Sequence, residues 1–173
     1  MRDMTVKIVV PICGKREFIW IGVFMVWRVS NILVTMPQCD PMNINGTPTR
    51  TLRAHPEQGV IDIIDQTRLP HALHWLRVGT LDDAAHAIRA MQVRGAPLIG
   101  ATAAYGLAIA LAVDASDTHL QHAAHLLRST RPTAVNLHWA LSRMEAALKL
   151  LPAAHRLAAA WQEASAISEE DVL

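Results

Sequence analysis

The sequence is poor in cysteine and in aromatic residues, and it has almost no net charge. Its 173 residues include two cysteines, 5% aromatic residues and 16 basic against 15 acidic residues, for a formal charge of +1. Cys13 and Cys39 show no CxxC spacing, so neither a disulfide framework nor a metal cluster is indicated, and a reducing, cytoplasmic compartment is expected. The balanced charge offers no large basic face for phosphate-backbone contacts, which argues against a nucleic-acid partner.

The N-terminal part also lacks an apolar run long enough to span a bilayer. The run Phe18–Trp27 has ten residues and follows Lys15 and Arg16, as in a signal peptide, whereas a spanning helix needs about 20 apolar residues. This run could be a cleaved signal, a membrane anchor, or a leader or stray buried strand outside the domain. The last of these is favoured. No membrane partner is expected.

The segment Pro37–Pro56 contains four prolines and is predicted to be a loop or linker, after which the domain begins. Two short β-branched or apolar segments follow, Val60–Asp65 and Ala72–Val78, with a turn at Asp65–Pro70 between them. The remainder is rich in Ala and Leu, which favour helix. The predicted fold class is therefore α+β and mainly helical: a small antiparallel β hairpin or sheet followed by a helical bundle.

Helix signals begin at Thr80, which precedes Asp83 in the spacing of a capping box. Apolar residues then recur on one face through Leu81–Met91, and this helix is predicted to stop near Gly95. Pro97 suits the first turn of a second helix, whose continuation Leu98–Val113 is apolar almost all round and is therefore expected to be buried.

Three more helices are predicted, and the last is followed by a further helix start. Their ranges are His119–Leu127, Pro132–Leu150 and Ala153–Ile167. The acidic segment Ser168–Asp171 resembles the N-terminus of another helix.

The corner Arg94–Pro97 is the strongest candidate for a binding site. A helix start leaves backbone N–H groups unpaired and carries partial positive charge, which suits a phosphate, and Arg94 adds a guanidinium group beside the small residues Gly95 and Ala96. On this pattern alone an ordinary turn with a surface arginine is the favoured alternative. Arg131 precedes Pro132 in the same way, although for Arg131 alone a C-cap ligand of the preceding helix is the favoured interpretation. The two corners could converge on one anion.

Other kinds of site find little support. His122 and His125 have helical i, i+3 spacing but no third ligand nearby, so no metal site is expected. His71 and His74 suit polar positions at a strand edge. There is no recognisable Ser/His/Asp set and no glycine-rich dinucleotide loop, and no cofactor is expected.

Three ordered blocks carry a family resemblance: Asp65–Pro70 (DQTRLP), Met91–Gly106 (MQVRGAPLIG followed by AAYG) and Arg131–Leu137 (RPTAVNL). Together they resemble the N-terminal half of S-methyl-5-thioribose-1-phosphate isomerase, of the initiation factor two-B alpha/beta/delta-like family. The match covers about residues 50–173. It implies that residues 1–45 are a non-matching, disordered extension, and that residues 46–173 are the family's N-terminal helical domain, truncated at its C-terminal end.

The resemblance implies an aldose–ketose isomerase of L-methionine salvage, which converts S-methyl-5-thioribose 1-phosphate to S-methyl-5-thioribulose 1-phosphate. Arg94, Gly95, Ala96 and Arg131 would hold the sugar phosphate, with no metal or cofactor, in a protein that is a homodimer when full-length. The family's catalytic cysteine and aspartate belong to a C-terminal Rossmann-like domain, so no catalytic residue is expected in this chain and it should be inactive alone.

Three other functions remain open. The regulatory subunits of initiation factor two-B share the architecture and act through protein contacts, and ribose 1,5-bisphosphate isomerase is a closer enzymatic relative. A purely helical interaction module is the third. The methionine-salvage interpretation is favoured because the first two blocks occur together with both arginines intact.

Overall fold

The computed structural model describes residues 43–44 and 47–170, all within the compact unit Pro41–Leu173. The predictions about the apolar run Phe18–Trp27 and about Cys13 and Cys39 lie outside these residues.

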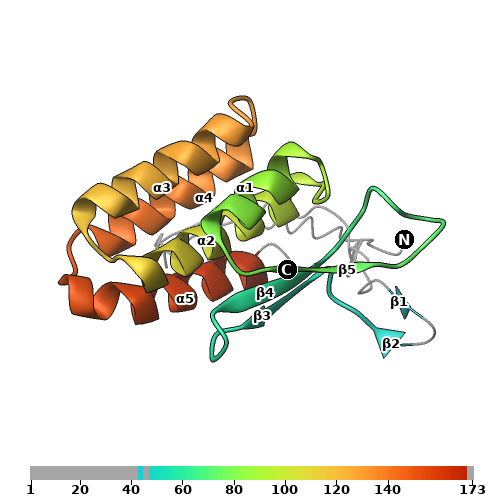
Figure 1. The fold of residues 1–173 in the computed structure, drawn as a ribbon, viewed down its shortest axis with the longest axis horizontal. Coiled ribbons are helices and arrows are strands. Elements are labelled where there is room, and N and C mark those ends of the chain that lie inside the picture. Colours follow the sequence, from blue (N-terminus) through green and yellow to red (C-terminus); the bar gives the residue numbers. More distant parts are fainter. Residues whose placement is uncertain (1–42, 45–46, 171–173) are drawn as a thin grey trace, which may run out of the picture. The chain divides into compact units, whose positions relative to one another are not determined.

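The described strands form two antiparallel sheets (Figure 1). A two-stranded pair joins β1 (Asn43–Ile44) to β2 (Thr47–Pro48), and a three-stranded sheet has the order β3 (Leu52–His55), β4 (Val60–Ile64), β5 (Trp75–Val78). The predicted hairpin is confirmed as β4 and β5.

The prediction of a linker through Pro56 is wrong for β3. This strand alternates apolar and polar residues over only four positions, and the neighbouring prolines hide that short pattern. In the sheet, Leu52 pairs with Ile63 and Ala54 with Ile61. The apolar residues of β3 and β4 together form one buried face, which β3 alone is too short to indicate. The opposite face is polar: Asp62 accepts a hydrogen bond from Arg77 Nε at 3.0 Å, which lowers the pKa of its carboxyl group.

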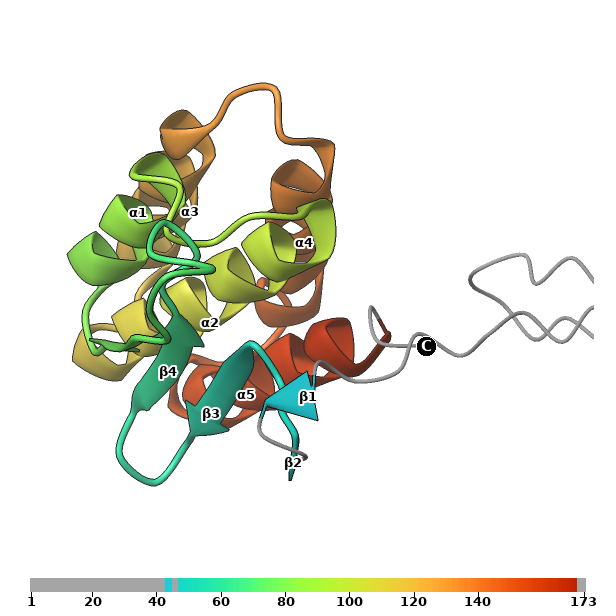
Figure 2. The same cartoon turned by 90° about the vertical axis from the view of Figure 1, so that its right-hand side faces the viewer.

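Five helices follow the three-stranded sheet in the described chain, as the predicted fold class requires. They are α1 (Leu81–Arg89), α2 (Ala96–Val113), α3 (Asp117–Thr130), α4 (Val135–Leu148) and α5 (Ala153–Glu170). Figures 1 and 2 show α2 at the centre of the bundle, and it contacts all four other helices.

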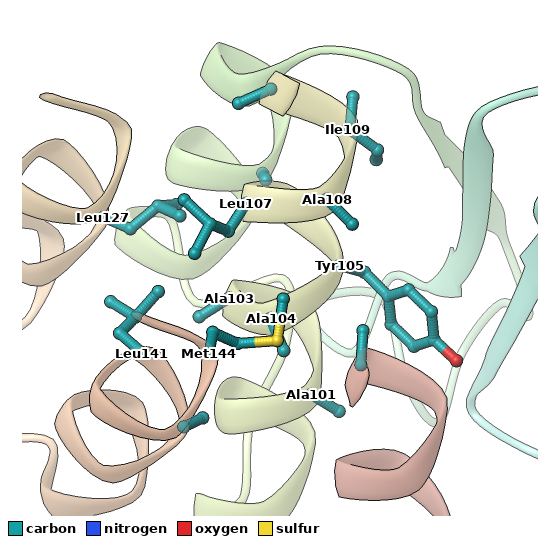
Figure 3. Packing of buried hydrophobic residues seen from close by; sticks show 14 of the residues in the cluster. Ala101, Ala103, Ala104, Tyr105, Leu107, Ala108, Ile109, Leu127, Leu141 and Met144 are labelled. Carbon is teal, nitrogen blue, oxygen red and sulfur yellow. The ribbon is translucent and has the colours of Figure 1, made fainter. Parts of the chain in front are cut away.

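The central helix α2 is buried along most of its length, as its composition predicts. Figure 3 shows its alanines and Leu107 packed against side chains such as Leu127 of α3 and Leu141 and Met144 of α4. By length and composition α2 could also cross a membrane, but 72% of it is buried within the protein, and a core helix passes the same test.

The capping box at the start of α1 is confirmed. Asp83 N donates to Thr80 Oγ1 at 3.1 Å, and Thr80 N donates to Asp83 Oδ2 at 3.0 Å. The predicted stop near Gly95 is wrong: the helix ends at Arg89, because Met91 adopts a left-handed backbone with φ 58°.

The start of α3 and the end of α5 also differ from prediction. α3 begins at Asp117 because Ser116 caps it: His119 N donates to Ser116 Oγ at 3.3 Å. No new helix begins at Ser168, since α5 continues to Glu170. Its terminal acidic residues are ion-pair partners of distant arginines, Glu169 of Arg50 and Glu170 of Arg143, rather than an N-terminal cap.

Gly106 is required where α1 crosses α2. A Cβ atom built at Gly106 would lie 2.7 Å from Ala84 Cβ, closer than real Cβ contacts allow. We expect Gly106→Ala to lower the free energy of unfolding by about 1–2 kcal/mol, because the overlap outweighs alanine's better helix propensity. Urea denaturation measures the change. Gly79→Ala is the control, since its Cβ would meet Val60 at an ordinary 3.5 Å; equal losses for the two variants would contradict this account of the crossing.

Candidate functional site

The start of α2 presents backbone donors that no side chain caps. Gly95 is the N-cap residue with φ 89°, a left-handed conformation that favours glycine, and it makes no side-chain cap hydrogen bond. The helix begins with Ile99 N donating to Gly95 O at 3.1 Å. The N–H groups of Ala96 and Leu98 have no partner within the helix, and Pro97 has no N–H to satisfy.

The second corner differs from its prediction, because α4 begins at Val135 and not at Pro132. Residues Arg131–Ala134 instead form a turn in which Ala134 N donates to Arg131 O at 3.0 Å. Ala134 becomes the N-cap, and it too lacks a side-chain cap hydrogen bond. Arg131 is the C-cap residue of α3 by its backbone. The second helix start is therefore displaced by three residues but is equally uncapped.

Gly100 allows the starts of α2 and α4 to come close together. A Cβ atom at this position would lie 3.1 Å from Asn136 O and 3.5 Å from Ala140 Cβ, so only a glycine leaves the first turn of α4 where it is. Two uncapped helix N-termini, each with partial positive charge, consequently lie beside one another.

Both arginines predicted from the sequence line one cleft of about 430 Å³ at these two helix starts. The predicted residues Arg94, Gly95, Ala96 and Arg131 all contribute to its wall. The cleft is completed by residues of the two corners and their first helical turns: Met91, Ile99, Thr133, Ala134, Val135, Asn136 and Leu137. The structure thus places Arg94 and Arg131 at the same cavity and not on opposite sides of the molecule.

The charges of these two arginines are not neutralised within the described chain. Six arginines of the described chain each pair with a carboxylate: Arg50, Arg68, Arg77, Arg128, Arg143 and Arg156. Arg94 and Arg131 do not, and neither do Arg53 and Arg89, which lie outside the cleft wall. Arg94 makes one hydrogen bond, from Nε to Met91 O at 3.3 Å. Two guanidinium groups without a carboxylate partner and two uncapped helix N-termini are features that suit an anion such as a phosphate.

The Asp65–Pro70 block does not line the cleft, but it is hydrogen-bonded to the loop beside the cleft. Asp65 is buried, and it accepts hydrogen bonds from Thr67 N and Oγ1, which lower the pKa of its carboxyl group. The next residue reaches the first corner: Gln66 N donates to Gln92 O at 2.9 Å. The block therefore fixes the loop next to the Arg94 corner.

Sequence reasoning missed seven cleft residues, including Met91, Thr133 and Asn136. All three lie within the blocks that carried the resemblance, so their position beside Arg94 and Arg131 was the available signal. His122 and His125 lie on α3 outside the cleft lining. No group of three or more His, Cys, Asp or Glu side chains suitable for a metal ion occurs among the described residues.

Comparison with known proteins identifies the family to which the chain belongs. The sequence model of the Initiation factor 2 subunit family matches residues 92–172, which contain both corners. The chain belongs to this family. An uncharacterized protein in the petC 3′ region of Rhodospirillum rubrum is 56% identical over 131 residues, which make up 76% of this chain and 71% of that protein.

Within the family, the chain is similar to methylthioribose-1-phosphate isomerases. The isomerase of Dechloromonas aromatica is 73% identical over 131 residues, covering 76% of this chain and 36% of that enzyme. The crystal structure of 5-methylthioribose 1-phosphate isomerase from Pyrococcus horikoshii superposes with a TM-score of 0.65 at 32% identity, over 75% of this chain and 40% of that one. The chain thus spans about a third of the length of the isomerase sequences it matches.

A second solved structure belongs to a protein of another function. The translation initiation factor eIF-2B subunit delta from A. fulgidus superposes with a TM-score of 0.60 at 41% identity, over 65% of this chain and 35% of that one. The same helical architecture is therefore found in an isomerase and in an initiation factor.

Proposed function

We propose that this chain supplies the phosphate-binding part of an aldose–ketose isomerase that acts on S-methyl-5-thioribose 1-phosphate in L-methionine salvage. In this proposal, residues 46–173 form the N-terminal domain of that enzyme, which is a homodimer when full-length. The observation that carries the proposal is the cleft itself, where two unpaired arginines meet two uncapped helix starts. The 73% identity to the isomerase of Dechloromonas aromatica supports the choice of substrate.

The cleft residues form two groups, one suited to the phosphate and one suited to the sugar of a sugar phosphate. The N–H group of Ala96 and the guanidinium groups of Arg94 and Arg131 bind the phosphate oxygens. Thr133 and Asn136 offer a hydroxyl and an amide, which suit the hydroxyl groups of the sugar. Each side chain is thus assigned a role in binding and orientation.

The cleft wall has no group suited to the chemical step. Isomerisation moves a proton or a hydride between C2 and C1 of the sugar, which calls for an acid or base with an adjustable pKa. None of the described residues that line the cleft is a carboxylic acid, a histidine or a cysteine, and arginine stays protonated. We therefore assign the acid and base to groups outside this cleft wall.

The purified 173-residue chain should bind S-methyl-5-thioribose 1-phosphate but should not convert it. Proton NMR of the substrate detects binding by line broadening and conversion by new resonances of the ketose product. The isomerase of Dechloromonas aromatica serves as the positive control for turnover. Product formed by the chain alone would refute the assignment of the acid and base elsewhere, and absence of binding would refute the site.

A regulatory interaction module is the second candidate, favoured by the similarity to the eIF-2B subunit delta from A. fulgidus. A module of that kind would act through protein contacts and would not depend on the anion site. Arg94→Ala distinguishes the two functions, because it weakens sugar-phosphate binding if the cleft binds substrate and leaves binding to a protein partner unchanged if the chain is a module.

A further inference from the structure

Met91 has an unusual backbone conformation at the edge of the cleft. Its φ is 58°, in the left-handed region that non-glycine residues seldom occupy. Its side chain is 43% exposed, so burial does not explain why a methionine stands there. Strained backbone of this kind persists where the surroundings fix it, and it is often found at functional sites.

Hydrogen bonds on both sides hold this turn. On the side of α1, Met91 N donates to Ile88 O at 3.3 Å and Gln92 N donates to Ala87 O at 2.9 Å. On the other side, Gln66 N donates to Gln92 O at 2.9 Å, which ties the turn to the loop at Asp65. The direction of the Met91 carbonyl is therefore set by the fold and not by Arg94.

That carbonyl accepts the Arg94 Nε hydrogen bond of 3.3 Å. A guanidinium group has five N–H donors, and using Nε leaves the four on the two terminal nitrogens for an anion. An exposed arginine otherwise has many rotamers, and binding would have to select one of them. An arginine held at Nε presents its terminal nitrogens in a fixed direction before the anion arrives.

We propose that Met91 is a positioning residue: its left-handed backbone aims a carbonyl oxygen at Arg94 Nε and thereby orients the Arg94 guanidinium for phosphate. This inference rests on the proposed anion site. A residue that tolerates the left-handed region, such as asparagine, retains the function, whereas a β-branched residue disfavours that conformation and turns the carbonyl away.

The test is a double-mutant cycle on the full chain with inorganic phosphate as the probe. Met91→Ile should weaken phosphate binding about fivefold, a fraction of the effect of a hydrogen bond to a charged group. Met91→Asn should bind phosphate like the wild type. In the Arg94→Ala background, Met91→Ile should cause no further loss, because the oriented group is gone. Leu150→Ala, an exposed position just past the far end of α4, is the control for nonspecific effects.

The outcomes separate this inference from the proposed function. Equal affinity for Met91→Ile and Met91→Asn, or a Met91→Ile effect that persists without Arg94, overturns the positioning role and leaves the site intact. An Arg94→Ala variant that binds phosphate like the wild type overturns the site itself. If Met91→Ile fails to fold in urea titrations, Met91→Val takes its place, because it carries the same β-branch with less bulk. Its phosphate affinity must fall below that of Met91→Asn, and equal affinity for these two variants overturns the positioning role.

Discussion

Replacing Arg156 by methionine should lower the free energy of unfolding by about 3 kcal/mol. Arg156 is 6% exposed and joins three parts of the bundle. Its Nε donates to Leu148 O at 3.2 Å and Leu151 O at 3.0 Å, and its Nη1 donates to Ala115 O at 2.8 Å. Methionine keeps the apolar stem but removes the donor to Leu151 O and Ala115 O, whereas Leu148 O still accepts from Leu151 N at 3.1 Å.

The surface pair between Arg77 and Asp62 provides the control. Arg77 is 62% exposed, so Arg77→Met should cost no more than about 1 kcal/mol. Urea denaturation of both variants gives the comparison. A loss for Arg156→Met as small as that for Arg77→Met would show that the hydrogen bonds of Arg156 do not hold α5 to the end of α4.

Removing both cleft arginines should abolish measurable binding of S-methyl-5-thioribose 1-phosphate. A charge-assisted hydrogen bond contributes about 1.5–3 kcal/mol, so the double variant Arg94→Ala/Arg131→Ala should lose at least about 100-fold in affinity. Isothermal titration calorimetry measures the change. The variant should fold normally, because neither guanidinium pairs with a carboxylate in the described chain.

A control with the same loss of charge tests whether position matters. Arg89→Ala/Lys149→Ala also removes two positive charges, from exposed positions outside the cleft wall. Its affinity should stay within about twofold of the wild type, since exposed charges at a distance are largely screened by salt. Similar losses for the two double variants would mean that general charge, and not the cleft, attracts the ligand.

The first corner could be predicted from the sequence because its signals are local. Gly95 and Pro97 mark a helix start within three residues, and the adjacent Arg94 supplies the charge. The uncapped start of α2 confirms that part of the prediction. Thr80 and Asp83 were equally informative, because a capping box is also a local pattern.

Other features depend on partners far away in the sequence. β3 is a strand because Leu52 and Ala54 find Ile63 and Ile61 across the sheet, and its four residues alone do not reveal this. The start of α4 at Val135 was mistaken for Pro132 because a proline in a turn and a proline in a first helical turn look alike in sequence.

The meeting of the two arginines could be hypothesised from the sequence, but local patterns do not establish it. It depends on Gly100 approaching the backbone of Asn136, a contact across 36 residues that no local sequence pattern specifies. The left-handed turn at Met91 gave no local signal either, since methionine has no preference for that conformation.

The central claim is that an anion binds where α2 and α4 begin. Its most direct test is a titration of the isotope-labelled chain with inorganic phosphate, followed by amide chemical shifts in two-dimensional NMR. The account predicts saturable shifts that are largest at Gly95, Ala96 and Asn136. It is contradicted if those amides do not respond, or if the largest shifts lie elsewhere, such as on the polar face of the sheet around Arg77.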